Sequence, residues 1–332
     1  MELREFGPDD AAAVAAFVEV ENAVRAVDSP WQHPRTPRGT EMALRHGWDG
    51  EPDRAFLVED GGLPVGTASL GASEWDNLDL AWLDLAVHPD HRRRGLGSRA
   101  LHALHEECLR IGRPLVGLES WDAPAPRGFA AAHGYEEKSR SANRRQHLHE
   151  LDDLLAATYD EAVAVAHDYE LFRIAGPSPV ELHAELATVA ESINDAPLDD
   201  LEIEDEVYPP ERLQAFERAQ TGSGRRLYRV VARHRESGEL AGHTVVTVED
   251  ERPWIGTQED TTVVASHRGH RLGLLLKADL ARWLREVEPQ LQTVDTWNAV
   301  SNDHMVGVNE RLGYRVIGVA LAFQRRLTPA SG

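Results

Sequence analysis

Two stretches of the chain carry arginines and glycines in a pattern that suits phosphate binding. Residues 87–101 read VHPDHRRRGLGSRAL, and residues 263–277 read VVASHRGHRLGLLLK. Backbone N–H groups at the start of a helix bind anions, and glycine lets the backbone approach the anion's oxygen atoms closely. Each stretch follows an apolar run typical of a strand and leads into a helical pattern. Both therefore predict a phosphate-binding loop between a strand and a helix.

The two stretches repeat one another at a constant offset of 263 − 87 = 176 residues. That offset is one domain length, since domains run to about 100–200 residues and solenoid repeats recur every ~20–50 residues. In a chain of 332 residues it indicates an internal duplication. The identical pairs are Val87 and Val263, His91 and His267, Arg92 and Arg268, Leu96 and Leu272, and Gly97 and Gly273.

The elements that must position the loops follow the same order in both halves. Periodic patterns predict helices, a hairpin, a strand, a long helix, a strand, a short helix and a closing strand. The strand, helix and strand around the loop take residues 80–87, 98–111 and 114–120, and again 258–265, 272–287 and 291–298. We predict a first domain at 1–150, a linker at 151–168 and a second domain at 169–332.

The amino-acid composition limits the possible binding partners of the protein and the cellular compartment in which we expect it. A net charge of −21 argues against nucleic acid, which needs a basic surface, and suits a cationic substrate. No apolar run reaches the ~18 residues of a membrane helix, and the charged first residues do not resemble a signal peptide, so we expect a cytoplasmic protein without a membrane partner. The single cysteine, Cys108, excludes an internal disulfide and a cysteine-rich metal site, and we predict no metal.

The motif Arg92-x-x-Gly95-x-Gly97 resembles the Arg/Gln-x-x-Gly-x-Gly/Ala motif of the GNAT acetyltransferase superfamily, whose loop binds the pyrophosphate of acetyl-CoA. Asn302, followed by Leu312-Gly313-Tyr314, is similar to a second motif of that family. Because the resemblance covers both halves, the chain resembles tandem GNAT proteins of the general kind that includes mycothiol synthase. It implies two α+β domains, each a mixed, mostly antiparallel sheet flanked by helices. It also implies acetyl-CoA-dependent acetyl transfer to a small amine.

The resemblance further implies which residues bind acetyl-CoA. The backbone N–H of the strand before each loop, at Val87 and Val263, is the expected donor to the reacting oxyanion. The implied cofactor residues are Val87, Arg92, Arg93, Arg94, Gly95, Leu96, Gly97 and Ser98 in the first half, and Val263, Arg268, Gly269, His270, Arg271, Leu272, Gly273 and Asn302 in the second.

Acetyl transfer also needs a base, because an alkylamine with a pKa near ~10 attacks only after losing a proton. Four acids near strand ends are candidates: Asp84, Glu119, Glu259 and Asp260. The other interpretation is that they are solvated or structural acids. The tyrosine that protonates the leaving thiolate in the family falls on Ala130 and Asn309, which puts that step in doubt. Since the second half has Asn302, we expect both halves to bind CoA and the second half to carry the chemistry.

Two other functions fit parts of the sequence. Gly95 to Ala100 also matches the G-x-G-x-x-A pattern of a nicotinamide-dependent oxidoreductase, with Glu119 as the ribose-binding acid. The glycines come seven residues after the strand, however, and the second copy has Arg271 and Asn298 at the corresponding positions. The missing tyrosines also fit a catalytically silent acyl-CoA-binding or sensing protein.

Overall fold

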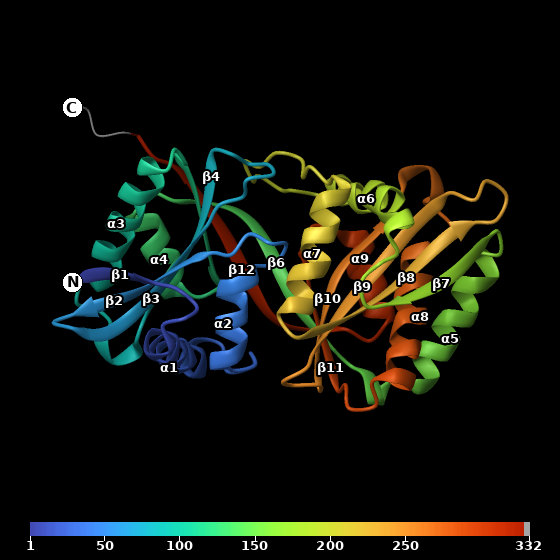
Figure 1. The fold of residues 1–332 in the computed structure, drawn as a ribbon, viewed down its shortest axis with the longest axis horizontal. Coiled ribbons are helices and arrows are strands. Elements are labelled where there is room, and N and C mark those ends of the chain that lie inside the picture. Colours follow the sequence, from blue (N-terminus) through green and yellow to red (C-terminus); the bar gives the residue numbers. More distant parts are fainter. Residues whose placement is uncertain (329–332) are drawn as a thin grey trace. The chain divides into compact units, whose positions relative to one another are not determined.

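The computed structural model describes residues 1–328 and divides the chain into two compact units (Figure 1). Unit 1 consists of Met1–Ser141, Leu198–Asp205 and the chain from Gly318 on, and unit 2 of Ala142–Pro197 and Glu206–Ile317. This division differs from the predicted one. Residues 151–168, predicted as a linker, contain helix α5 (Asp152–Val165) of unit 2. Among residues 1–328, we find no helix that combines the length and the apolar character of a membrane span.

The sheet of unit 1 is mixed and mostly antiparallel. Its strand order is β1-β2-β3-β4-β5-β12, and only β4 and β5 pair in parallel. Gly61 and Gly62 turn the hairpin between β2 and β3 with positive φ angles, as expected for glycine. The strands are β1 (Glu2–Phe6), β2 (Arg54–Asp60), β3 (Leu63–Gly71), β4 (Leu80–Val87), β5 (Leu115–Trp121) and the later part of β12 (Arg315–Arg326).

Helices cover both faces of this sheet, because alternate strand residues point to opposite faces. Ala55 and Leu57 pack with helix α1 (Ala11–Asp28), which is accompanied by α2 (Pro37–His46). Phe56 and Leu83 pack on the opposite face with α3 (Leu96–Arg110) and α4 (Pro124–Ala132). The α1 face matters most below, because the polar residues of β3, β4 and β5 point to it.

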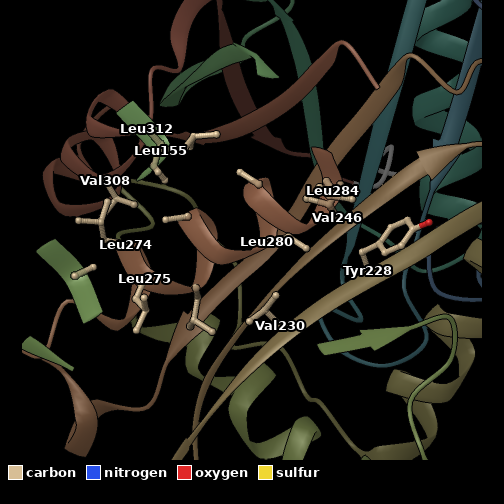
Figure 2. Close-up of a cluster of buried hydrophobic side chains, with 14 of the residues drawn as sticks. Leu155, Tyr228, Val230, Val246, Leu274, Leu275, Leu280, Leu284, Val308 and Leu312 are labelled. Atoms are coloured by element: carbon tan, nitrogen blue, oxygen red, sulfur yellow. The ribbon is translucent and has the colours of Figure 1, made fainter. Parts of the chain in front are cut away.

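Unit 2 repeats this architecture, with strand order β6-β11-β10-β9-β8-β7. Its largest apolar cluster joins β8 and β9 to α5, α8 and α9, and includes Leu155, Leu275 and Val308 (Figure 2). The elements are β6 (Glu136–His147, ending in unit 2), β7 (Tyr169–Ala175), α6 (His183–Glu191), α7 (Pro210–Gly222), β8 (Arg225–His234), β9 (Leu240–Glu249), β10 (Ile255–Val263), α8 (Leu272–Val287), β11 (Thr293–Ala299) and α9 (Asp303–Arg311). The predicted α+β class with tandem repeats is confirmed.

The closing strands do not stay with their own halves of the sequence. In unit 1, Ala320–Arg326 of β12 pair antiparallel with Leu115–Trp121 of β5. In unit 2, the end of β6 contacts β11, where Asn143 Nδ2 donates to the carbonyl of Thr296 at 3.2 Å. Each half of the sequence therefore supplies strand residues to the unit built mainly from the other half.

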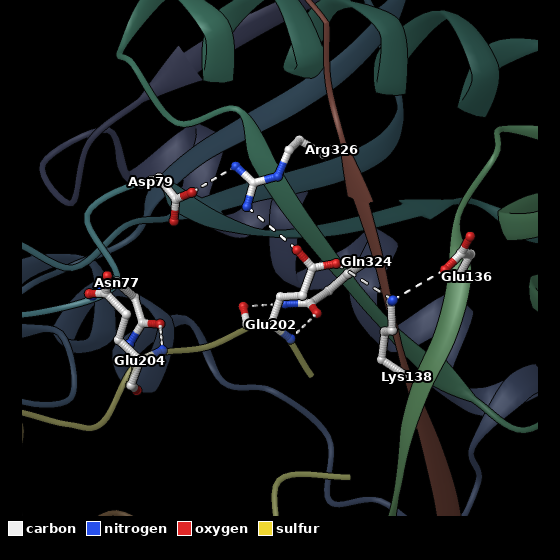
Figure 3. Close-up of polar contacts among 8 residues, drawn as sticks. All are labelled: Asn77, Asp79, Glu136, Lys138, Glu202, Glu204, Gln324 and Arg326. Atoms are coloured by element: carbon white, nitrogen blue, oxygen red, sulfur yellow. Dashed lines mark hydrogen bonds and ion pairs between the residues drawn. The ribbon is translucent and has the colours of Figure 1, made fainter. Parts of the chain in front are cut away.

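A third segment of unit 1, Leu198–Asp205, also comes from the second half of the sequence (Figure 3). The backbone N–H of Glu202 donates to Gln324 Oε1 at 2.7 Å, and Gln324 Nε2 donates back to the carbonyl of Glu202 at 3.2 Å. The N–H of Glu204 donates to Asn77 Oδ1 at 2.7 Å. These reciprocal bonds fix the segment to β12 and to the loop before β4.

We expect residues 1–150 expressed alone to remain unfolded. They lack β12, which pairs with β5 and supplies the buried side chains of Leu321 and Phe323. Losing one such side chain costs about 2–5 kcal/mol, and a domain has only about 5–15 kcal/mol in total. Amide NMR spectra and thermal melts measure this, and joining residues 318–328 to the fragment through a flexible linker restores the fold. A well-dispersed spectrum of the bare fragment contradicts the expectation.

Candidate active site

In each unit, two parallel strands pair at their beginnings and then separate. The β4–β5 ladder runs from Leu80 opposite Leu115 to Leu83 opposite Leu118, and the β10–β11 ladder ends at Thr257 opposite Asp295. Within the described residues the ladders continue no further, although both strands do. Backbone groups beyond these points are therefore available to a ligand that enters between the strands.

The structure directs the backbone of Val87 and Val263 toward these openings. The N–H of His88 donates to the carbonyl of Val65 on β3 at 2.9 Å. Because successive N–H groups along a strand point to opposite sides, the N–H of Val87 points away from β3. Val264 donates to Ala241 on β9 at 2.9 Å, so the same holds for Val263.

The first arginine of each motif braces the end of its strand. Arg92 Nε donates to the carbonyl of Val87 at 3.0 Å, and its guanidinium binds Asp28 through two hydrogen bonds of 3.0 and 2.6 Å. In unit 2, Arg268 Nε donates to the carbonyl of Val263 at 3.1 Å. This arginine thus fixes the loop to the strand in both units.

The two loops share one backbone shape although their glycines differ. Arg93 and Gly95 have φ angles of 62° and 72°, and Gly269 and Arg271, 176 residues later, have 86° and 57°. Helix α3 begins at Leu96, two residues before the predicted start near Ser98, and α8 begins at Leu272, as predicted. A turn of 3-10 helix, Pro89–His91, separates β4 from this loop, unlike the direct strand-to-helix turn of a dinucleotide-binding motif.

The unit 1 loop suits an anion such as pyrophosphate. Arg93, Arg94 and Gly95 are exposed, and a Cβ on Gly95 would meet no atom within 4 Å. The first N–H groups of α3, from Leu96 to Ser98, have no partner inside the helix. This donor set, with two arginines beside it, fits a phosphate group.

The unit 2 loop is more enclosed. Arg271 forms an ion pair with Glu161 of α5, which also binds Arg311. Leu272 and Gly273, the first two residues of α8, are buried. His270 and Gly269 remain exposed, and Asn302 caps α9 by accepting a hydrogen bond from the N–H of Met305 at 3.1 Å.

A cavity of about 250 Å³ lies in unit 1 beside the opening between β4 and β5. It brings together two of the predicted bases, Asp84 of β4 and Glu119 of β5, with Asp53, which the sequence analysis did not identify. It lies on the α1 face of the sheet, where the hydroxyl of Thr67 donates to Glu21 of α1 at 2.7 Å. The remaining lining residues are Ser69, Gly71, Trp82 and Leu83.

The side chains of Asp53, Asp84 and Glu119 are solvent-exposed where they face the cavity, but the protein around them displaces part of the water that would stabilise their charges. This desolvation, and secondarily the charge of Asp84, raises the pKa of Glu119 to about 7. Desolvation and the charge of Glu21 raise the pKa of Asp84, against the opposing charges of Arg35 and Arg25. Desolvation and the charge of Asp84 raise the pKa of Asp53. Glu119 therefore has the pKa of a general base that works near neutral pH.

Glycines in the strands make room for this cavity's side chains. A Cβ on Gly71 would lie 2.4 Å from Asp53 Oδ1, and a Cβ on Gly117 would lie 2.3 Å from Trp82 Cε3. Trp82 is paired with Gly71 on one side and Gly117 on the other. The carboxylate of Asp53 thus lies over β3, and the indole of Trp82 lies over β5. Glycine inside a strand is the sequence signal that marks such close approaches.

Unit 2 places its predicted bases differently. The β9–β10 register shifts between Gln258 and Thr261, so Glu259 and Asp260 lie next to each other in a bulge. Burial, with the charges of Glu206 and Glu259, raises the pKa of Asp260 to about 7. Glu259 accepts a hydrogen bond from the hydroxyl of Thr247 at 2.9 Å. Unit 2 therefore also contains a candidate base.

The second half has no acid that corresponds to Glu119. Trp82 pairs with Gly117 in unit 1, and Thr257 pairs with Asp295 at the corresponding place in unit 2. Two residues further along the second strand of each pair are Glu119 in unit 1 and Trp297 in unit 2, so these two residues correspond. The carboxylate of Asp295 forms an ion pair with Arg145, which donates two hydrogen bonds of 2.7 Å to it. The two units thus share loops and strand openings but differ in the acids beside them.

Neither unit has a hydroxyl where the family resemblance expects the thiolate acid. Ala130 is buried in unit 1. Asn309 is buried in unit 2, where it accepts a hydrogen bond from Lys277 Nζ at 2.7 Å. Burial lowers the pKa of Lys277 to about 7, so this amine can release a proton near neutral pH.

Comparisons with known proteins agree with this geometry. The pattern of the acetyltransferase (GNAT) family matches residues 20–135 and 190–314. A mycothiol acetyltransferase of Parafrankia sp. (strain EAN1pec) is 29% identical over 132 residues, which are 39% of this chain and 37% of that protein. An acetyltransferase of Sodalis glossinidius is 30% identical over 118 residues, 36% of this chain and 74% of that protein. The chain thus matches well under half the length of the mycothiol relative.

Solved structures extend the similarity to the whole chain. A tandem GNAT protein from the clavulanic acid biosynthesis pathway, solved without AcCoA, is 26% identical with a TM-score of 0.83, over 99% of both chains. A GCN5-related N-acetyltransferase from Sphaerobacter thermophilus shares the fold, with 15% identity and a TM-score of 0.68, over 99% of this chain and 96% of that one. The family pattern matches both halves of the chain and covers more than half of the chain's residues. The chain therefore belongs to the GNAT family of N-acetyltransferases and is a tandem member of that family.

Proposed function

We propose that unit 1 transfers the acetyl group of acetyl-CoA to the amino group of a small cationic substrate, with Glu119 as the general base. The observation that carries this proposal is the position of Glu119 and Asp84 in one cavity beside the opening between β4 and β5. Carboxylates in that position attract an ammonium group and can then accept its proton.

Acetyl-CoA, when bound, supplies an acetyl group activated as a thioester. The first-turn N–H groups of Leu96, Gly97 and Ser98, with Arg93 and Arg94, are the residues we assign to its pyrophosphate. The N–H of Val87, which points into the strand opening, is the donor we assign to the oxygen that becomes negative during transfer.

The amine reaches the cavity protonated, since its pKa is near ~10. Glu119, with its pKa raised to about 7, is ionised in a large fraction of molecules at neutral pH and accepts the proton before attack. The cavity is open, so the proton passes from Glu119 to solvent after transfer. Ala130 cannot protonate the leaving thiolate, and we assign no side chain to that step.

Asn302 favoured the second half as the active one, but the carboxylates favour unit 1. Unit 1 combines an exposed anion-binding loop with a carboxylate-lined cavity. In unit 2 the first two residues of α8, Leu272 and Gly273, are buried, and Trp297 stands where unit 1 has Glu119. Asp260 remains the candidate base of unit 2, and it is the control residue for the experiments below.

Incubation with acetyl-CoA and a panel of small amines tests the proposed function. We expect release of free thiol that depends on the amine, together with a product heavier by one acetyl group. For a cationic amine, turnover falls as the salt concentration rises, because salt screens the attraction between exposed charges. Binding of acetyl-CoA without thiol release for any amine would instead support the silent acyl-CoA-binding alternative.

A further inference from the structure

We propose that the acceptor of unit 1 carries two positive charges: the amino group that is acetylated beside Glu119, and a second cationic group held by Asp53 and Asp84. This inference rests on the proposed function and specifies its substrate class as a short aliphatic diamine or a molecule with that spacing of charges.

The three carboxylates form a row that leads away from the strand opening. Glu119 lies on β5, Asp84 on the neighbouring strand β4, and the carboxylate of Asp53 over Gly71 on β3. Paired strands are about 4.8 Å apart, and β4 and β5 separate beyond Leu83 and Leu118, so the two ends of this carboxylate row are at least about 10 Å apart. The opening where the acetyl group arrives lies at the Glu119 end, which leaves the Asp53 end for a distant part of the acceptor.

The carboxylate row has more negative charge than its surroundings neutralise. Within residues 1–328, no lysine or arginine forms an ion pair with Asp53, Asp84 or Glu119. Arg35, one of the two cations that act on Asp84, donates its own hydrogen bond to Glu21 at 3.3 Å. Carboxylates this close to one another repel unless a cation lies between them. A dication supplies one positive charge at each end of the row.

The wall of the cavity between Glu119 and Asp53 suits the hydrocarbon chain that joins the two amino groups of a diamine. Trp82 lines the cavity and lies between Gly71 and Gly117 in the sheet. Its indole face can cover a methylene chain and attract a neighbouring ammonium group. A side chain at Gly71 would displace Asp53, and one at Gly117 would displace Trp82.

Unit 2 has no equivalent of this arrangement. The strand registers match Gly71 with Thr247 and Gly117 with Asp295. Thr247 is hydrogen-bonded to Glu259, and Asp295 is neutralised by Arg145. The site for a second cation is therefore a feature of unit 1.

The experiment compares kcat/KM of the full chain for diaminobutane, aminobutane and aminobutanol, at fixed acetyl-CoA. These probes share one reacting amine and differ in the charge at the other end. A hydrogen-bonded charge pair contributes about 1.5–3 kcal/mol, so we expect diaminobutane to be favoured by roughly 10–100-fold. Asp53→Asn, and independently Gly71→Ala, which moves the Asp53 carboxylate, should reduce that ratio about tenfold.

Glu2→Gln is the matched control, because it removes one negative charge from β1, at the opposite edge of the unit 1 sheet from β5 and β12. Its ratio should equal that of the parent. Acetyl transfer with equal kcat/KM for all three amines would overturn the inference and leave the proposed function standing. An equal fall of the ratio in Glu2→Gln would also overturn it. The absence of transfer to every amine would refute the proposed function itself.

Discussion

Replacing Glu119 by glutamine is expected to lower kcat/KM for amine acetylation by about 10²–10⁴-fold, the usual contribution of a positioned general base. Glutamine keeps the size of the side chain on β5 but cannot accept a proton. Steady-state thiol release measures the effect. Asp122→Asn, one residue beyond β5 and paired with Arg127, serves as the control and should stay near the parent value.

The pH profile separates this role from a structural one. Desolvation by the surrounding protein raises the pKa of Glu119 to about 7, and only the ionised carboxylate accepts a proton. The parent's kcat/KM should therefore fall as the pH decreases through about 7, and Glu119→Gln should lose that dependence. If the variant keeps the same acid limb, or if Asp260→Asn abolishes turnover instead, Glu119 is not the base.

Replacing Gly97 by glutamate is expected to abolish acetyl-CoA binding and turnover. Gly97 is in the first turn of α3, where a glutamate is compatible with the helix but places a negative charge where phosphate binds. Facing like charges cost several kcal/mol, which corresponds to more than about 10²-fold in affinity. Its Cβ would lie 3.4 Å from Phe129 Cε2, so the backbone accommodates a side chain. Calorimetry with acetyl-CoA and the thiol assay measure both effects.

Gly273→Glu, at the corresponding position of α8, is the matched control and should leave turnover intact. Gly97→Ala should also keep most of the binding, which shows that the charge and not the Cβ is responsible. The opposite pattern, with turnover lost in Gly273→Glu and kept in Gly97→Glu, would assign the chemistry to the second half, as Asn302 suggested.

The loops before α3 and α8 could be predicted from the sequence because anion binding allows only a few residue types at their key positions. An anion-binding backbone needs left-handed positions and a helix start, and these left a recognisable pattern at Gly95 and Gly273. The pattern did not reveal which residues adopt the left-handed conformation. Arg93 and Arg271 adopt this conformation, and each lies two residues from a glycine that also adopts it. Only the backbone angles of the structure show this.

The acids were harder to match between the halves. A constant offset of 176 pairs Asp84 with Asp260, but the bulge at Glu259 and Asp260 adds a residue to β10. On β5 the strand pairing instead matches Glu119 with Trp297. A fixed offset fails wherever a bulge or a loop changes length, and periodicity alone does not detect a single inserted residue.

Asp53 and the strand exchange could not be predicted for a different reason. Asp53 precedes β2 and comes close to Asp84 only through the lateral order of the sheet. Alternating apolar residues in β12 indicate which face of a strand is buried, but not which strand is its neighbour. Gly71, the last residue of β3, and Gly117, inside β5, were the available signals for the cavity.

The strand exchange also sets the order in which the protein can be completed during synthesis. Met1–Ser141 of unit 1 leave the ribosome first, but β5 obtains its partner only when Gly318–Arg326 have been made. The intervening residues 142–317 take roughly 10–35 s to translate at about 5–20 residues per second. During that time β5 presents an unpaired edge, which is a template for association with other chains. The unit that we propose as the catalytic one is therefore begun first and finished last.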